Sequence, residues 1–256
     1  MIKNFIKAIV ELFPYSARIT PWGFSLAGHA AMAAGSFEPE ETKVVRKLLA
    51  DVDVLVNVGA NVGYYCCHAL SMGKSVIAVE PNTRNLHYLL KNIKNNGWEK
   101  KAEVFPVAMG SGTDILPMWG GGTGASLIKG WAATPERYVT QVPVLSLDRV
   151  LGDTLRGKSA LILVDVEGAE WMMLQGAKRA LMNEPRPIWM MEICFAEHQP
   201  AGVAMNPHFK ETFGIFFECG YRAFTADSTA LEITPAMVDE VVVGHRKLET
   251  HNFIFR

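Results

Sequence analysis

The sequence predicts an α/β fold in which helices cover both faces of a parallel β-sheet. Short, almost continuously apolar runs alternate along the chain with helical patterns of about 10 to 15 residues, an order typical of βαβ units. Strands that are apolar at successive positions are buried on both faces, as in parallel sheets. Glycine follows the helical patterns that end at Met72 and Asn96, where a residue with positive φ can end a helix.

The alternation begins after a helix over residues 40–50, whose apolar side chains recur at helical intervals. The expected strands of the sheet are residues 52–58, 75–79, 102–107, 160–166 and 188–193, with two closing strands at 221–224 and 252–255. The expected crossover helices are residues 62–72, 83–96, 169–182 and 207–219. Residues 142–145 form a further strand, and the Ser146 hydroxyl can cap a short helix over residues 147–151.

The chain divides into a leading segment, residues 1–39, and one domain, residues 40–256. The leading segment holds an amphipathic helix over residues 1–13 and then an irregular cover segment. Charged residues interrupt this helix, and it is far shorter than the roughly 20 apolar residues that span a bilayer. We expect it to pack on the domain or on a second subunit of a homodimer. Attachment to a membrane surface is the less favoured alternative.

Charge and cysteine usage narrow the classes of function. Lys and Arg number 25 against 26 Asp and Glu, so no strong basic field is expected to hold a nucleic acid. Cys66, Cys67, Cys194 and Cys219 form no CxxC pair and no zinc-ligand spacing, and no metal site is predicted. We interpret all four as small buried side chains of a protein in a reducing compartment, the cytoplasm.

A glycine-bearing turn follows the first expected strand. Gly59 and Gly63 lie where this strand passes into a helix, a place where free backbone N–H groups and close backbone approach favour a ligand. The spacing lacks the G-x-G-x-x-G pattern of dinucleotide sites, because Asn61 stands where the middle glycine would be. The turn therefore favours a nucleoside-like ligand over a dinucleotide. An ordinary strand-to-helix turn is the alternative.

Glu80 ends the second expected strand, about 20 residues after Gly59. An acidic residue at this place binds the ribose hydroxyls of a nucleotide in doubly wound folds. Asp165 and Glu167 follow the fourth strand of the parallel series and face the same expected crevice. Carboxylates there can accept a proton, orient an amine or cap the following helix.

At these residues the sequence resembles the FkbM-type family of S-adenosylmethionine-dependent methyltransferases. The resemblance lies in residues 54–63 (VLVNVGANVG), 78–82 (AVEPN), 146–148, 163–170 (LVDVEGAE), 192–193 and 252–255. It implies the class I methyltransferase fold, a three-layer α/β structure with a seven-stranded, mostly parallel sheet whose last strand is antiparallel. It also implies that S-adenosylmethionine is the cofactor and that the acceptor is a hydroxyl group on a small molecule or sugar.

The resemblance also assigns roles to residues. Those expected at the cofactor are Asn57, Gly59, Ala60, Asn61, Gly63, Glu80, Asn82, Ala108 and Asp165. Asp165 is the first candidate for the base that removes the acceptor proton, followed by Glu167, Glu192 and His198. His198 can equally be a solvated loop residue.

The chain departs from the family pattern at Asn57, where the family usually has Asp. A neutral amide there weakens electrostatic attraction for the methionine end of the cofactor, unless Asp165 has taken over the role. This departure is the one hint of an alternative function, a cofactor-binding protein with little or no catalysis. An NAD-dependent dehydrogenase is a second alternative, against which the missing dinucleotide pattern counts.

The middle of the chain, residues 110–141, interrupts the alternation of strands and helices. It is rich in glycine and contains Trp119 and Trp131. Such an insertion is either a loop that covers the substrate or a surface excursion. Trp119, Trp131 and Phe195 either wall the acceptor pocket or belong to the core, and packing is the role expected of Tyr64 and Tyr65.

Overall fold

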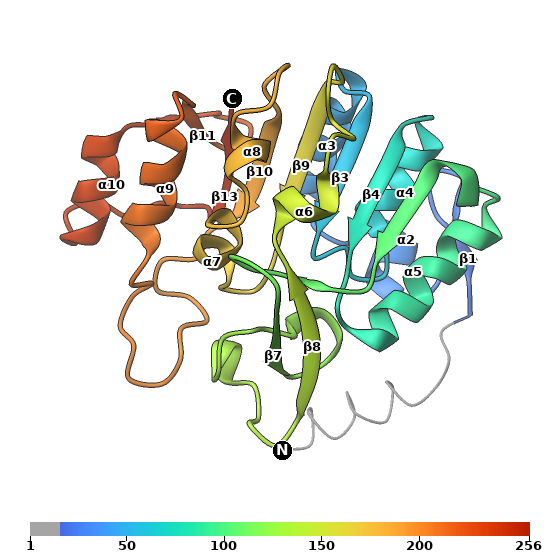
Figure 1. Ribbon diagram of the computed structural model, residues 1–256, viewed down its shortest axis with the longest axis horizontal. Helices are drawn as coiled ribbons and strands as arrows, with labels where there is room; N and C mark the ends of the chain where they lie inside the picture. Colours follow the sequence, from blue (N-terminus) through green and yellow to red (C-terminus); the bar gives the residue numbers. More distant parts are fainter. Residues whose placement is uncertain (1–15) are drawn as a thin grey trace.

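The computed structural model describes residues 16–256, and its largest element is an eight-stranded sheet (Figure 1). The strand order is β12-β11-β13-β10-β9-β3-β4-β5. Five of these strands run parallel: β3 (Val54–Val58), β4 (Ser75–Val79), β5 (Ala102–Phe105), β9 (Ala160–Val164) and β10 (Ile188–Glu192). The other three are β11 (Ala223–Thr225), β12 (Glu232–Ile233) and the last strand, β13 (Asn252–Phe255). β13 runs antiparallel to β10, as predicted. Within this eight-stranded sheet, the strand that was not predicted is the two-residue edge strand β12.

Helices form a layer on each face of this sheet (Figure 1). One face is covered by α3 (Pro39–Ala50), α4 (Tyr64–Ser71) and α5 (Thr83–Asn95). The other is covered by α6 (Leu147–Leu151), α7 (Glu170–Leu174), α8 (Lys178–Leu181), α9 (Phe209–Glu218) and α10 (Pro235–Val242). Side chains of a strand alternate between the faces, so Val54, Val56 and Val58 pack on the second helix layer and Leu55 on the first. The three-layer α/β prediction is confirmed.

The helix predicted over residues 169–182 is two helices, α7 and α8. Gly176 lies between them, and a Cβ atom at this position would come within 2.2 Å of the Gly110 carbonyl oxygen. Glycine at this position lets the chain between the two helices pass close to the backbone of Gly110. The Asp148 carboxylate then caps α8, because it accepts hydrogen bonds from the backbone N–H groups of Arg179 and Ala180 at 2.9 and 3.0 Å.

The insertion folds into a second, three-stranded sheet. Its strands are β6 (Ala108–Met109), β7 (Asp114–Trp119) and β8 (Val139–Leu145), in the order β6-β8-β7. Two short 3₁₀ helices, Gly122–Gly124 and Trp131–Ala133, lie between β7 and β8. The strand predicted at residues 142–145 is present, as part of this second sheet. The β7–β8 hairpin projects beyond the carboxyl ends of the parallel strands (Figure 1).

The described part of the leading segment contains β1 (Arg18–Ile19), β2 (Ser25–Leu26) and α2 (Ala30–Ala34). Two asparagines, Asn92 of α5 and Asn96 directly after it, hold it through its backbone. The Asn92 side chain bonds the N–H and C=O of Ala27 at 2.8 and 2.9 Å. Asn96 bonds the same two groups of Ser25 at 2.9 and 2.8 Å. The predicted helix at residues 1–13 lies outside the described residues.

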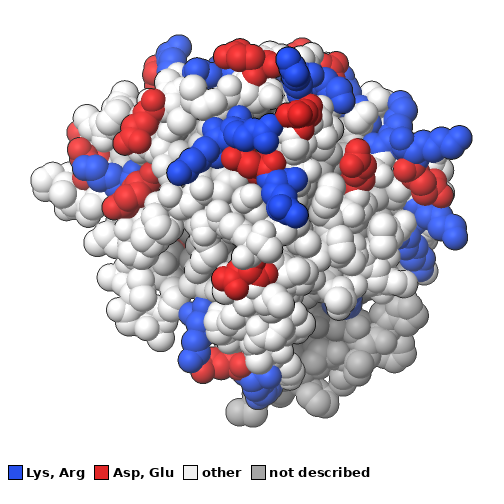
Figure 2. Space-filling model, in the orientation of Figure 1, with Lys and Arg blue, Asp and Glu red and all other residues white. Residues whose placement is uncertain are grey.

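Charged side chains are unevenly distributed over the face seen in Figure 2. Lys, Arg, Asp and Glu are interspersed at the upper end, and the lower end, around the insertion, has few of them. Figure 2 therefore shows no stripe of one charge on this face. Within residues 16–256, no helix combines the length and apolar character needed to cross a membrane.

Candidate active site

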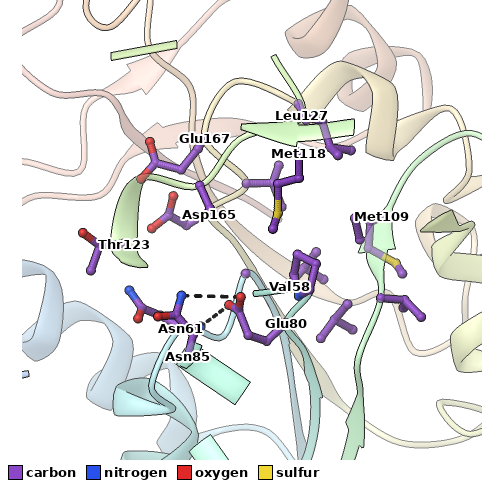
Figure 3. A pocket seen from close by; sticks show the side chains of 18 of the residues that line it. Val58, Asn61, Glu80, Asn85, Met109, Met118, Thr123, Leu127, Asp165 and Glu167 are labelled. Atoms are coloured by element: carbon purple, nitrogen blue, oxygen red, sulfur yellow. Dashed lines mark hydrogen bonds between the residues drawn. The ribbon is translucent and has the colours of Figure 1, made fainter. Parts of the chain in front are cut away.

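A cavity of about 580 Å³ lies at the carboxyl ends of β3, β4 and β9 (Figure 3). Six residues predicted for the site line it: Gly59, Asn61, Glu80, Ala108, Asp165 and Glu167. Each follows the end of a strand or belongs to β6, so the topology brings together residues that lie far apart in the sequence. Glu80 and the pair Asp165 and Glu167 thus share one cavity.

Gly59 is required by the geometry of the turn. Its φ is +83°, and a Cβ atom would lie 1.8 Å from the backbone oxygen of Asp165. Any side chain here would clash with the strand end that carries the candidate base. The N–H groups of Gly59 and Ala60 both donate to the Val79 carbonyl at 2.9 Å, which joins the turn to the end of β4.

The Glu80 carboxylate is oriented by backbone donors. It accepts hydrogen bonds of 2.7 Å from the N–H groups of Asn61 and Asn82, one on each oxygen, and a longer one of 3.5 Å from the Asn85 amide. Burial of this side chain, 4% exposed, raises its pKa to about 7, against the opposing effect of these hydrogen bonds. Figure 3 shows Glu80 projecting from the end of β4 into the cavity.

Asp165 and Glu167 lie together on one side of the cavity (Figure 3). Asp165 is an exposed residue that lines the cavity, and no described residue donates a hydrogen bond to its carboxylate. Desolvation by the surrounding protein atoms, followed by the charges of Glu192 and Glu167, raises the pKa of Asp165 well above its ordinary value. Burial also raises the pKa of Glu167, whose backbone φ is +53°.

The insertion covers this cavity. Met118, Thr123 and Leu127 line it, and the Asn85 amide donates to the Gly122 carbonyl at 2.8 Å. Of the two alternatives for the insertion, the structure thus supports a covering segment. The sequence did not single out Asn85, Met118, Thr123 or Leu127, because their approach depends on how the insertion folds back.

Other predicted residues lie near the cavity without lining it. Asn82 caps α5, since its Oδ1 accepts from the N–H groups of Arg84 and Asn85. Gly63 precedes α4, and a Cβ atom there would come within 2.5 Å of Leu89, so the structure places it at a packing contact. His198 is exposed and lines none of the described cavities.

The three aromatic residues considered for the acceptor pocket have different surroundings. The Trp131 side chain is buried, and its ring centroid lies 6.0 Å from that of His198. Trp119 ends β7 and is only partly buried. The Phe195 ring packs edge-on against Phe209 at 5.0 Å. None of the three lines the cavity that contains Glu80.

A second cavity, of about 540 Å³, adjoins the first. Gly59, Asn61 and Asp165 line both, so the two cavities meet at the end of β3. Asn57 and Ala60 lie in the second cavity, together with Glu192, Glu38 and Tyr65. Glu38 was not identified from the sequence, because it lies in the leading segment and no local motif relates it to the strand ends.

Comparison with known proteins identifies the family. The model of the methyltransferase FkbM domain matches residues 57–223, so the chain belongs to the FkbM family of methyltransferase domains. Its fold is the class I, Rossmann-like methyltransferase fold. No curated protein matches the chain.

Solved structures with similar folds include the methyltransferase FkbM from Methylobacillus flagellatus KT, at 19% identity and a TM-score of 0.48. Another is the tRNA (uracil-54, C5)-methyltransferase of Pyrococcus abyssi in complex with S-adenosyl-L-homocysteine, at 13% identity and a TM-score of 0.46. The matches cover 80% and 94% of this chain, and 44% and 43% of those proteins. The chain therefore spans less than half the length of either protein.

Proposed function

We propose that this protein transfers a methyl group from S-adenosylmethionine to a hydroxyl group of a small molecule or sugar. The observation that carries the proposal is the cavity shared by Gly59, Glu80 and Asp165. This cavity is lined by the turn at Gly59, by the Glu80 carboxylate, which backbone hydrogen bonds orient, and by the Asp165 carboxylate, whose pKa is raised.

The residues present fit this cofactor. Glu80 accepts two short backbone hydrogen bonds and a longer one of 3.5 Å from the Asn85 amide, and a carboxylate has about four acceptor positions, so Glu80 retains at least one acceptor for a ribose hydroxyl. Val79, Val107 and Met109 provide an apolar wall for an adenine ring. Gly59 lets the ends of β3 and β9 lie close together, because a Cβ atom there would clash with the backbone oxygen of Asp165.

Asp165 is suited to remove the acceptor proton. When bound, S-adenosylmethionine supplies a methyl group already activated by a positively charged sulfur. A carboxylate with a raised pKa is a stronger base, and this one faces the cavity with no described hydrogen-bond donor in contact. A positioned base contributes about 10²- to 10⁴-fold to such a reaction. Glu167 lies beside Asp165 and would help to orient the acceptor.

A small acceptor suits a cavity that the insertion covers. The near-zero net charge and the interspersed charges in Figure 2 also favour a small molecule over a nucleic acid, whose phosphates require a concentrated basic surface.

Titration of the purified protein with S-adenosylmethionine and with NAD tests the cofactor. Binding of the first alone is expected, and binding of NAD alone would contradict the proposal in favour of the dehydrogenase. Glu80→Ala should weaken S-adenosylmethionine binding at least about tenfold, which corresponds to about 1.4 kcal/mol of lost charge-assisted hydrogen bonding. Glu103→Ala, at an exposed position of β5, is the control and should bind normally.

A cofactor-binding protein without turnover is the second candidate, and the neutral Asn57 at the end of β3 favours it. Incubation with S-adenosylmethionine and a panel of hydroxylated acceptors separates the two candidates. An active enzyme forms S-adenosylhomocysteine and a methylated product, whereas the second candidate binds the cofactor and forms neither.

A further inference from the structure

A third cavity, of about 900 Å³, lies apart from the two cavities described above. It is formed by α9, by α10, by the segment after β10 and by residues 244–251, which connect α10 with β13. No described residue lines both this cavity and either of the other two. Its volume lies in the range of small-molecule sites, roughly 300 to 1,000 Å³. The third cavity is therefore large enough for a ligand of its own.

The floor of the third cavity is apolar and rich in phenylalanine. Phe209 and Phe253 are buried, and Phe195, which the sequence suggested as a wall of the acceptor pocket, is half-buried. The Phe195 ring lies edge-on to that of Phe209, at 5.0 Å. The remaining apolar residues of the floor are Ile193, Val241 and Leu248. Such a lining favours an apolar ring system, because burying the ring removes apolar surface from water and lets it pack against other rings.

The charged side chains of the third cavity lie at its rim and are of both signs. Glu197, Lys247 and Glu249 line the cavity and are exposed. Arg246 also lines it, and its guanidinium is paired with Glu240, with 2.6 Å between Nε and Oε2. A ligand with a strong charge of one sign would meet a like charge at this rim. The lining therefore suits a neutral ligand.

The third cavity adjoins the second at the ends of β10 and β13. Glu192 and Asn252, which are paired across these two strands, line the second cavity. The residues next to them, Ile193 and His251, line the third. Neighbouring side chains point to opposite faces of a sheet, so one pair of strand ends separates the two cavities. His251 lies at this boundary, because its Nε2 is 3.7 Å from Oε1 of Glu192.

We propose that the third cavity binds the ring system of the methyl acceptor, and that the acceptor is a neutral hydroxylated aromatic compound rather than a free sugar. This inference rests on the proposed function, because the methyl group must come from the adjoining cavities that Asp165 lines. Phe195 and Leu248 select the ring by apolar contact. A hydroxyl group that reaches His251 points from the ring toward the second cavity, and the imidazole can form a hydrogen bond with it.

Calorimetric titration of the full chain with 2-naphthol, a neutral aromatic alcohol, tests the site. Saturating S-adenosylhomocysteine is present, so that 2-naphthol cannot occupy the place of the adenine ring. Methyl glucoside is the corresponding probe for a sugar acceptor. The variants are Phe195→Leu and Leu248→Ala. The matched control is Val243→Ala, since Val243 is 63% exposed, lies just before the connecting segment and lines none of the described cavities. Thermal unfolding and S-adenosylhomocysteine binding check that each variant is folded.

The wild type should bind 2-naphthol and should not bind methyl glucoside. Phe195→Leu and Leu248→Ala should each weaken 2-naphthol binding at least about fivefold, because each removes apolar contact with the ring. Val243→Ala should bind 2-naphthol like the wild type, and all three variants should bind S-adenosylhomocysteine normally.

Two results would overturn the proposal. One is binding of methyl glucoside without binding of 2-naphthol, and the other is equal affinity for 2-naphthol in the wild type, Phe195→Leu and Leu248→Ala. A protein that binds S-adenosylhomocysteine but no 2-naphthol, up to the solubility limit of the probe, would refute the aromatic site and leave the proposed function standing. A protein that binds 2-naphthol through Leu248 but does not bind S-adenosylhomocysteine would refute the proposed function itself.

Discussion

The Trp131 indole nitrogen donates a 2.7 Å hydrogen bond to the carboxylate of Glu167. The bond connects the insertion to the segment that follows β9. Two further contacts strengthen the connection: the Ser126 hydroxyl donates to the Glu167 carbonyl at 2.5 Å, and the Trp131 ring packs where a Cβ atom of Gly168 would come within 2.6 Å. The cover of the cavity is therefore tied directly to the carboxylate beside the candidate base.

Trp131→Phe should loosen the insertion without unfolding the domain. The variant keeps an aromatic ring but loses the hydrogen bond to a carboxylate, a bond of about 1.5 to 3 kcal/mol. Trypsin should then cleave after Lys129 or Arg137 at least about fivefold faster than in the wild type, because local opening exposes these sites. Trp119→Phe, on the same insertion and without a contact to Glu167, should be cleaved at the wild-type rate. Equal rates for the two variants would show that the hydrogen bond does not hold the insertion.

Gly59→Ala should destabilise the protein far more than Gly97→Ala. Both glycines have positive φ, +83° and +72°, so alanine is strained at both by about 1 kcal/mol. Only at Gly59 does a Cβ atom also meet a backbone oxygen, that of Asp165 at 1.8 Å, whereas the surroundings of Gly97 are open. Urea unfolding should show a difference of at least about 2 kcal/mol between the variants. Similar free energies of unfolding would contradict the close approach of the two strand ends.

The free energy of unfolding should depend on pH through Glu80. Its pKa is about 7 in the folded protein and near 4.5 in the unfolded chain, so the folded state binds this proton more tightly. The Glu80 carboxyl group makes its full contribution to the free energy of unfolding below about pH 4.5, and this contribution is lost as the pH rises to about 7. Relative to Glu80→Gln, the wild type should lose about 3 kcal/mol between pH 4 and pH 8. Other raised carboxyl groups are common to both proteins and cancel in the comparison. If the free energies of unfolding of the wild type and of Glu80→Gln changed equally with pH, the raised pKa of Glu80 would be disproved.

Iodoacetamide should distinguish Cys219 from the other three cysteines of the folded protein. Cys66, Cys67 and Cys194 are buried, and Cys219 is only partly buried. Burial raises the pKa of Cys66 to about 12 and that of Cys67 well above its ordinary value, so their reactive thiolates are scarce as well as inaccessible. Mass spectrometry after a short reaction should find the label on Cys219 alone, and on all four cysteines in guanidinium. Rapid labelling of Cys66 in the folded protein would count against the described packing of α4.

The parts of the site that follow directly from strand ends were predictable from the sequence. Gly59, Glu80 and Asp165 each come just after an apolar run, and parallel strands present their carboxyl ends at one edge. The strand β7 was not predictable in this way, because it carries Pro117 and is largely exposed toward its start, so it lacks a buried-strand pattern. The helix α10 was not predicted either, although it follows a good capping residue, Thr234. The sequence beside it contains no apolar run that would mark it as part of a βαβ unit.

The residues that the sequence could not assign depend on contacts between distant segments. Glu38 reaches the second cavity only because the leading segment packs across α4, and its partner Tyr65 looks, in the sequence, like an ordinary helix residue. Gly63 was predicted to contact the cofactor because of its spacing from Gly59. In the structure, the residue closest to a Cβ atom at this position is Leu89 on the next helix.

The two asparagines that hold the leading segment form hydrogen bonds only with its main-chain atoms. Asn92 and Asn96 are one helical turn apart, and they read the amide and carbonyl groups of Ala27 and Ser25, two residues apart on an extended chain. These hydrogen bonds do not depend on the side chains of Ser25 and Ala27, whereas Phe24 and Leu26 are buried in a hydrophobic cluster with α4. A substitution at the half-buried position 25 should therefore leave the register of this segment on the helix, and with it the reach of the carboxylate at position 38, unchanged.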